Sequence, residues 1–149
     1  MILAFEQLAH HPLRQREEAM IMKMEHVALN VSDPIAMAEW YTKHLGLEIV
    51  RSMTTPPYTH FLRDSGGTMM VEIYHNPPDQ VPSYSQMNPL VLHLAFVSSD
   101  PEADKSRLLD AGATSVQDES LPDGSLLIMM RDPWGIAIQL CKRGKPMLR

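Results

Sequence analysis

An internal repeat constrains the fold of this chain more than any other feature of its sequence. The segment "HVALNVSDP" begins at His26, and the similar segment "HLAFVSSDP" begins 67 residues later, at His93. At this offset the residues Ser32-Asp33-Pro34 align with Ser99-Asp100-Pro101. Recurrence at a fixed spacing indicates one supersecondary unit that is used more than once. We therefore predict that the chain folds as two copies of one unit.

Each copy begins with a strand of alternating apolar residues and continues with a helix. An aspartate followed by proline, Asp33-Pro34 or Asp100-Pro101, is typical of a helix N-terminus. Gly46 and Gly112 stand where the helices should end. Three further strands, separated by glycine- and proline-containing turns, follow in each copy. The expected strands are 24–31, 47–53, 58–63 and 68–75 in the first copy and 90–97, 114–119, 125–131 and 136–142 in the second, with helices over 34–45 and 101–111.

This order predicts an α+β fold of two tandem βαβββ modules, which form a curled mixed sheet around a central cavity. We expect a single domain over 24–142, with the repeats at 24–75 and 90–142 and a proline-rich linker at 76–89. Residues 143–149 form a basic tail. Residues 1–23 are an N-terminal extension with two open interpretations. They form a proline-interrupted helix packed on the domain or on a partner, or they reflect an upstream reading of the start codon.

Composition excludes several classes of partner. The chain has 149 residues, of which 44% are hydrophobic, so it can bury a core. Its formal charge of −5 argues against nucleic acid or an anionic membrane as the natural partner. No apolar run approaches the roughly 20 residues of a membrane span. The single cysteine, Cys141, precludes an internal disulfide, and we expect a cytoplasmic protein without a signal peptide.

Strand alternation places four polar residues on the faces that the helices leave uncovered. In the first strand of each copy, His26 and His93 point away from the apolar, helix-facing set. In the last strand of each copy, Glu72 and Gln139 are related by the same offset and project on the same side as the histidines. Any one of these residues is more often solvated than functional. The symmetry of the set favours a function, since four such groups brought together suit a divalent metal with open positions.

These features resemble the vicinal oxygen chelate superfamily, which includes glyoxalase I, methylmalonyl-CoA epimerase, extradiol dioxygenases and the bleomycin and fosfomycin resistance proteins. The resemblance covers residues 24 to 142, with "WYTKHLGLEIV", "LLDAGAT" and "DPWGIAIQL" as its signposts. It implies the paired-module fold specifically, but not one activity, because this fold supports several chemistries. Small molecules are the expected substrates, and the resemblance implies a homodimer.

The resemblance assigns the four metal ligands to His26, Glu72, His93 and Gln139, around one Zn, Ni, Co, Mn or Fe ion. In glyoxalase I-like enzymes the last position is usually a glutamate that also acts as the base. Gln139 carries no titratable proton, so Glu72 or a metal-bound hydroxide would have to move protons instead. Glu72 is thus the candidate catalytic residue. With one carboxylate the site keeps a formal charge of +1, which strengthens the metal as a Lewis acid.

Three functions follow from this ligand set. We favour a glyoxalase-like isomerase or lyase that stabilises an enediolate-like intermediate. An alternative is a non-haem iron extradiol-type dioxygenase, with His26, His93 and Glu72 as its facial triad. A second alternative is a metal-free protein that sequesters a drug or another ligand. Weaker candidates for substrate contact are Asn30, His60 and Tyr74.

Overall fold

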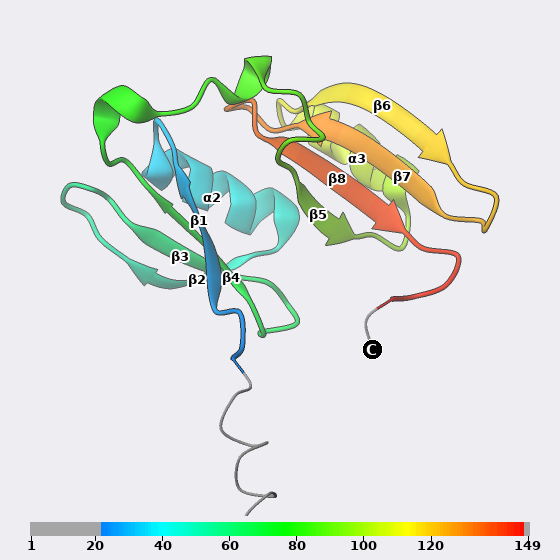
Figure 1. Ribbon diagram of the computed structural model, residues 1–149, viewed down its shortest axis with the longest axis horizontal. Coiled ribbons are helices and arrows are strands. Elements are labelled where there is room, and N and C mark those ends of the chain that lie inside the picture. The colour runs from blue at the N-terminus through cyan, green and yellow to red at the C-terminus, as the bar shows by residue number, and fades with distance from the viewer. Residues whose placement is uncertain (1–21, 148–149) are drawn as a thin grey trace, which may run out of the picture.

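The computed structural model describes residues 22–147 (Figure 1). Most of the expected N-terminal extension and the last two residues of the basic tail lie outside this range. None of the helices within the described range is long and apolar enough to cross a membrane.

Both modules have the βαβββ order that the repeat predicts. In each module the first strand pairs in parallel with the last, and the remaining pairs are antiparallel, so the two sheets have equivalent orders, β1-β4-β3-β2 and β5-β8-β7-β6. The α+β fold of two similar modules is therefore confirmed. The first module comprises β1 (His26–Asn30), α2 (Pro34–Leu45), β2 (Glu48–Ser52), β3 (His60–Arg63) and β4 (Met70–Tyr74). The second comprises β5 (Leu94–Val97), α3 (Pro101–Asp110), β6 (Thr114–Ser120), β7 (Leu126–Arg131) and β8 (Ala137–Lys142).

The helices begin where the aspartate–proline pairs place them. Asp33 Oδ1 accepts a hydrogen bond of 3.0 Å from the Ala36 amide, and Asp100 caps α3 in the same way. These caps satisfy amides that have no partner within the helix. At the other end of α2, Gly46 adopts the left-handed conformation with φ of 72°.

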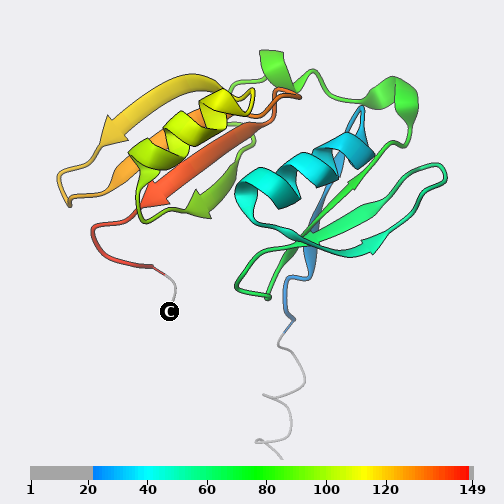
Figure 2. The same ribbon diagram turned by 180° about the vertical axis from the view of Figure 1, so that it is seen from behind.

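The two sheets carry their helices on the same side of the molecule. Figure 1 shows the strands in front and Figure 2, from behind, shows both helices covering them. Leu29 and Ile73 are buried under α2, and Ile138 and Leu140 are buried under α3, as the alternation predicts. Each sheet therefore keeps one face free of helix, and the two free faces lie side by side.

Helix α2 joins the modules. Trp40 packs against both core clusters, and its indole Nε1 donates a 2.8 Å hydrogen bond to the carbonyl of Ala111. At the end of α2, the carbonyl of His44 accepts a hydrogen bond from Arg107. Contact between the modules thus runs through the helix-covered side, and the strands form two separate four-stranded sheets.

The linker is more ordered than its proline content suggests. It contains two short 3₁₀ helices, η2 (Pro78–Gln80) and η3 (Tyr84–Gln86). The Arg131 guanidinium donates hydrogen bonds to the carbonyls of Tyr84, Met87 and Gly135, which fixes the linker to the β7–β8 turn. The strand expected from residue 90 begins only at Leu94, because the chain turns at residues 90–92 before it joins β8.

Candidate metal centre on the helix-free faces

The helix-free face of the first sheet brings His26 and Glu72 together. His26 Nε2 lies 3.2 Å from Glu72 Oε2. This meeting follows from the sheet register, in which Ala28 is opposite Glu72 and His26 is two residues before Ala28. Their side chains are partly accessible, at 35% for His26 and 19% for Glu72. The pair is therefore shielded yet still open to a ligand.

Phe61 is a third member of this face that the sequence patterns did not single out. In the antiparallel register of β3 and β4 it lies directly opposite Glu72. Its ring meets the His26 imidazole edge-on, with centroids 5.7 Å apart and an interplanar angle of 85°. Phe61 thus packs against the imidazole and limits its rotation. Its position between Leu62 on one side and His60 on the other was a usable signal, because alternation puts it on the face opposite Leu62.

The two histidines hold their rings in the same way. His26 Nδ1 lies 3.0 Å from Glu25 Oε1, and His93 Nδ1 lies 2.9 Å from the carbonyl oxygen of Pro89. A neutral imidazole that donates from Nδ1 keeps its lone pair on Nε2. This is the arrangement found in metal-ligating histidines, which almost always donate the other ring proton to a carboxylate or carbonyl.

Gln139 lies on the helix-free face of the second sheet, opposite Ala95 on one side and Met129 on the other. Its Oε1 accepts a weak hydrogen bond from the Cys141 thiol, at 3.2 Å. Burial raises the pKa of that thiol, so Cys141 is a small buried donor and not a reactive thiolate. A cavity of about 240 Å³ adjoins Gln139, bounded by linker residues 88–90 and by β6 and β7.

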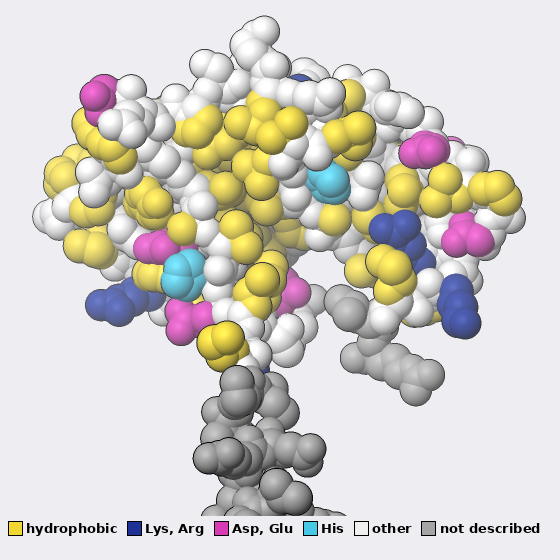
Figure 3. Space-filling model, in the orientation of Figure 1, with side chains coloured by type: hydrophobic (Ala, Val, Ile, Leu, Met, Phe, Trp, Pro, Cys, Tyr) yellow, Lys and Arg dark blue, Asp and Glu magenta, His cyan; other side chains and the backbone are white. Residues whose placement is uncertain are grey.

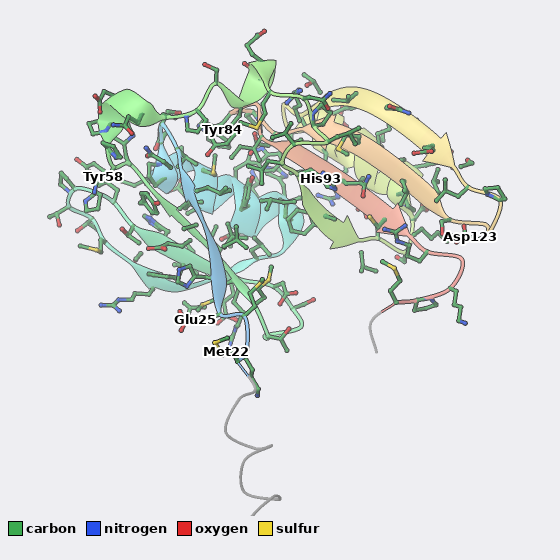
Figure 4. All side chains as sticks on the ribbon, in the orientation of Figure 1. Met22, Glu25, Tyr58, Tyr84, His93 and Asp123 are labelled. Carbon is green, nitrogen blue, oxygen red and sulfur yellow. The ribbon has the colours of Figure 1, made fainter. Side chains whose placement is uncertain are left out.

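The four candidate ligands are divided between the two modules of one chain. His26 and Glu72 lie in the first sheet, Gln139 lies in β8 of the second, and His93 precedes β5 by one residue. Figure 4 labels His93 beside the strands of the second module. Over residues 22–147, no three histidine, cysteine or acidic side chains gather closely enough to hold a metal ion. Figure 3 shows histidine on both modules and apolar side chains concentrated between them.

The two donors of the first sheet fit a metal ion. Two ligand atoms that are each about 2.1 Å from one ion, at an angle near tetrahedral, lie about 3.2 to 3.4 Å apart. The separation of 3.2 Å between His26 Nε2 and Glu72 Oε2 matches this requirement. Imidazole nitrogen with carboxylate oxygen is a donor set that suits zinc and its first-row neighbours.

The other substrate candidates have different environments. Both polar atoms of the Asn30 side chain bond the linker. Its Nδ2 donates to the Pro77 carbonyl, and its Oδ1 accepts from the Asn76 amide. His60 is buried and lies opposite Ile73, on the helix-covered side of the sheet. The sequence could have indicated this position, because Leu62, two residues later, lies on the same face as His60 and is apolar. Tyr74 is half-buried on the same face as Glu72.

The comparison with protein families identifies the superfamily of this chain. A model of the Glyoxalase/Bleomycin resistance protein/Dioxygenase superfamily matches residues 23–140. The chain belongs to this superfamily. The glyoxalase superfamily match thus spans both modules and all four candidate ligands, and it confirms the resemblance seen in the sequence. The comparison of this sequence with curated proteins found no match.

Several solved structures have the same fold as this chain. TnmS3, an antibiotic binding protein from Streptomyces sp. CB03234, has a TM-score of 0.63 at 19% identity, with 83% of this chain and 98% of that chain covered. A glyoxalase family protein from Enterococcus faecalis has a TM-score of 0.62 at 27% identity, with 80% of this chain and 97% of that chain covered. A superfamily member from Sphaerobacter thermophilus DSM 20745 has a TM-score of 0.61 at 18% identity, over 82% and 98% of the two chains.

Proposed function

We propose that this protein is a metal-dependent, glyoxalase-like enzyme that acts on a small molecule as an isomerase or lyase. One observation carries the proposal: His26 Nε2 and Glu72 Oε2 lie 3.2 Å apart, while Glu25 holds the far nitrogen of the ring. His93 and Gln139 supply the other half of the site.

A bound divalent ion would supply Lewis-acid stabilisation of negative charge on two neighbouring oxygens of a substrate. Of the two ligands in the last strands of the modules, Glu72 can exchange a proton with the substrate, whereas Gln139, an amide, cannot. The Glu72 oxygen that does not face His26, Oε1, is the atom available for this transfer. Phe61 packs edge-on against the His26 ring and restricts its orientation.

We further propose that a second copy of the chain completes the site. The donors of one chain are divided between two sheets that lie side by side and do not face each other. In a twofold dimer, the first sheet of each chain would face the second sheet of its partner, giving two identical four-ligand sites. The second module presents exposed apolar side chains suited to burial, with Val97 of β5 at 92% exposure and Leu90, in the turn before β5, at 79%.

Mixing two inactive variants tests this arrangement. His26→Ala and His93→Ala should each lose the metal, as measured by elemental analysis after reconstitution. If the site is shared, refolding an equal mixture restores one intact site in each mixed dimer, or about a quarter of the wild-type metal content. If all four ligands came from one chain, no mixture would recover metal. Wild-type protein that takes up no metal after reconstitution would overturn the enzyme proposal itself.

Substrate trials then separate the chemistries. Isomerisation of a hemithioacetal is the expected activity, and Glu72→Gln should abolish it because the proton acceptor is lost while the oxygen donor remains. Oxygen consumption with a catechol, in protein loaded with Fe²⁺, would instead favour extradiol-type dioxygenase chemistry. The variant Glu39→Gln, the same change at an exposed glutamate of α2, is the matched control.

A metal-free binding protein is the second candidate. The observation that favours it is an apolar cavity of about 380 Å³ beside β5 and the end of β8, lined in part by Phe96, Val97 and Met147. TnmS3, one of the structural relatives, is described as an antibiotic binding protein. This candidate predicts that an apolar ligand quenches tryptophan fluorescence equally in wild type and in His26→Ala. Loss of that binding in His26→Ala would count against it.

A further inference from the structure

We infer that Glu25 is a positioning residue for His26 and supplies the metal centre with a second carboxylate from behind the imidazole. This inference rests on the proposed function, because it concerns the same metal site. It assigns a role to a residue that lies outside the four ligands and that no sequence pattern indicated.

The His26 ring lies between two carboxylates. Glu25 Oε1 is 3.0 Å from Nδ1, and Glu72 Oε2 is 3.2 Å from Nε2. The Glu25 backbone is fixed as well, since its carbonyl accepts a 2.8 Å hydrogen bond from the amide of Met70, the first residue of β4. Figure 4 shows Glu25 at the base of β1, where the chain enters the first sheet. The glutamate side chain therefore starts from a position set by the sheet.

The contact to Glu25 favours the neutral tautomer of His26 that carries its proton on Nδ1. When Nδ1 donates its proton to the carboxylate, Nε2 presents its lone pair toward Glu72, where the metal would bind. The edge-on contact with Phe61 restricts the ring from a third direction. Rotation of the ring would break both interactions, so His26 is held in the geometry for ligation before any metal arrives.

The two histidines of the proposed site differ in their acceptors. His93 donates to a neutral carbonyl, that of Pro89, whereas His26 contacts a carboxylate. A charged acceptor makes a stronger hydrogen bond and leaves the imidazole a better electron donor to a metal. His26 should therefore be the stronger of the two nitrogen ligands.

Glu25 also supplies a negative charge that the amide at position 139 does not. A divalent ion with Glu72 as its only carboxylate ligand keeps a formal charge of +1. Glu25 places a further negative charge behind His26, where it offsets this charge through the ring and takes up no coordination position. The metal centre thus gains a second carboxylate, while Gln139 contributes an oxygen that cannot take up a proton.

Two measurements on the intact protein test the inference. Competition with a chelator gives the Zn²⁺ affinity of wild type, Glu25→Gln and Glu25→Ala. We expect Glu25→Ala to weaken binding by roughly 10- to 100-fold, and Glu25→Gln, which keeps an acceptor oxygen, to weaken it less. Glu39→Ala, an exposed glutamate on α2 with no described role, is the matched control and should bind as wild type does. In the metal-free protein at about pH 9, where an imidazole is neutral, ¹⁵N chemical shifts should report a larger share of the Nδ1-protonated tautomer of His26 in wild type than in Glu25→Ala.

A double-mutant cycle isolates the part due to charge. Gln139→Glu puts a carboxylate on the metal directly, so Glu25→Gln should cost less affinity in that background than in wild type. Equal losses in the two backgrounds would overturn the charge argument. Unchanged affinity together with an unchanged tautomer in Glu25→Ala would overturn the whole inference. Absence of metal binding in wild type would instead overturn the proposed function, while the tautomer measurement would still decide the role of Glu25.

Discussion

The hydroxyl of Tyr41 donates a 2.7 Å hydrogen bond to Asp132 Oδ2, and this bond joins the two modules in their buried centre. Tyr41 comes from helix α2 of the first module, and Asp132 from the β7–β8 turn of the second. Asp132 Oδ1 also accepts hydrogen bonds from the amides of Trp134 and Ile136. The carboxylate thus fixes its own turn and docks that turn against α2. This contact helps to determine the relative position of the two half-sites.

Burial raises the pKa of Asp132 to about 6, although hydrogen bonds from Tyr41 and from the turn oppose the shift. An unfolded aspartate has a pKa of about 3.9. The folded protein therefore binds more protons than the unfolded chain between roughly pH 4 and pH 6. The stability contributed by the protonated carboxyl is therefore full below pH 4 and is lost as the pH rises through 6. Relative to Asp132→Asn, wild type should lose on the order of 2 kcal/mol between pH 4 and pH 7.

Urea unfolding of wild type and Asp132→Asn at several values of pH measures this difference. Asparagine keeps the Oδ1 acceptor for the turn amides and removes the titration. Parallel stability profiles for the two proteins would contradict the shift in the Asp132 pKa.

Removal of the Tyr41 hydroxyl should weaken the contact between the modules. Tyr41→Phe leaves Asp132 Oδ2 buried without its donor, which should cost about 1 to 3 kcal/mol of unfolding free energy. Denaturant melts of Tyr41→Phe measure the loss, with Tyr58→Phe as the control because no hydrogen bond of its hydroxyl is present in the described structure. Equal stability of the two variants would show that the Tyr41–Asp132 bond contributes nothing net.

Gly135 is required for close packing of the linker. Its φ is 88°, and a Cβ added there would lie 2.7 Å from the Ser85 backbone nitrogen. Gly46 has a similar φ of 72° but open space around it. Alanine at position 46 should therefore cost about 1 to 2 kcal/mol for conformation alone. Gly135→Ala should cost more, because η3 must also move. Thermal melts of both variants test the ranking, which a smaller loss for Gly135→Ala would reverse.

Asn30 should act on stability and not on metal affinity. Both polar atoms of its side chain bond the start of the linker, so Asn30→Ala should destabilise the fold by about 1 to 2 kcal/mol. Zn²⁺ affinity, compared with that of His26→Ala in the same assay, should stay near the wild-type value. A large loss of affinity with unchanged stability would return Asn30 to the site itself.

Short-range patterns in the sequence were enough to predict the module. The aspartate–proline pairs set the helix starts, and strand alternation identified Leu29, Ile73 and Ile138 as core residues. The same alternation placed Glu72 on the helix-free face, where the sheet register brings it to His26. These features depend on residues within one strand, one helix or one sheet, so periodicity is sufficient to reveal them.

Relations beyond one sheet were decided by the tertiary structure. The sequence indicated one four-membered donor set. Contacts of Trp40 and Tyr41 with the second module set the two sheets side by side, with His26 and Glu72 in the first module and His93 and Gln139 in the second. The contact of Glu25 with His26 depends on side-chain direction at the first residue of β1, which no period reports. The repeat and the strand alternation determined the secondary structure of each module and the face on which its polar residues lie. Burial and hydrogen bonding between the modules, which join residues far apart in the sequence, decided the relative position of the two sheets.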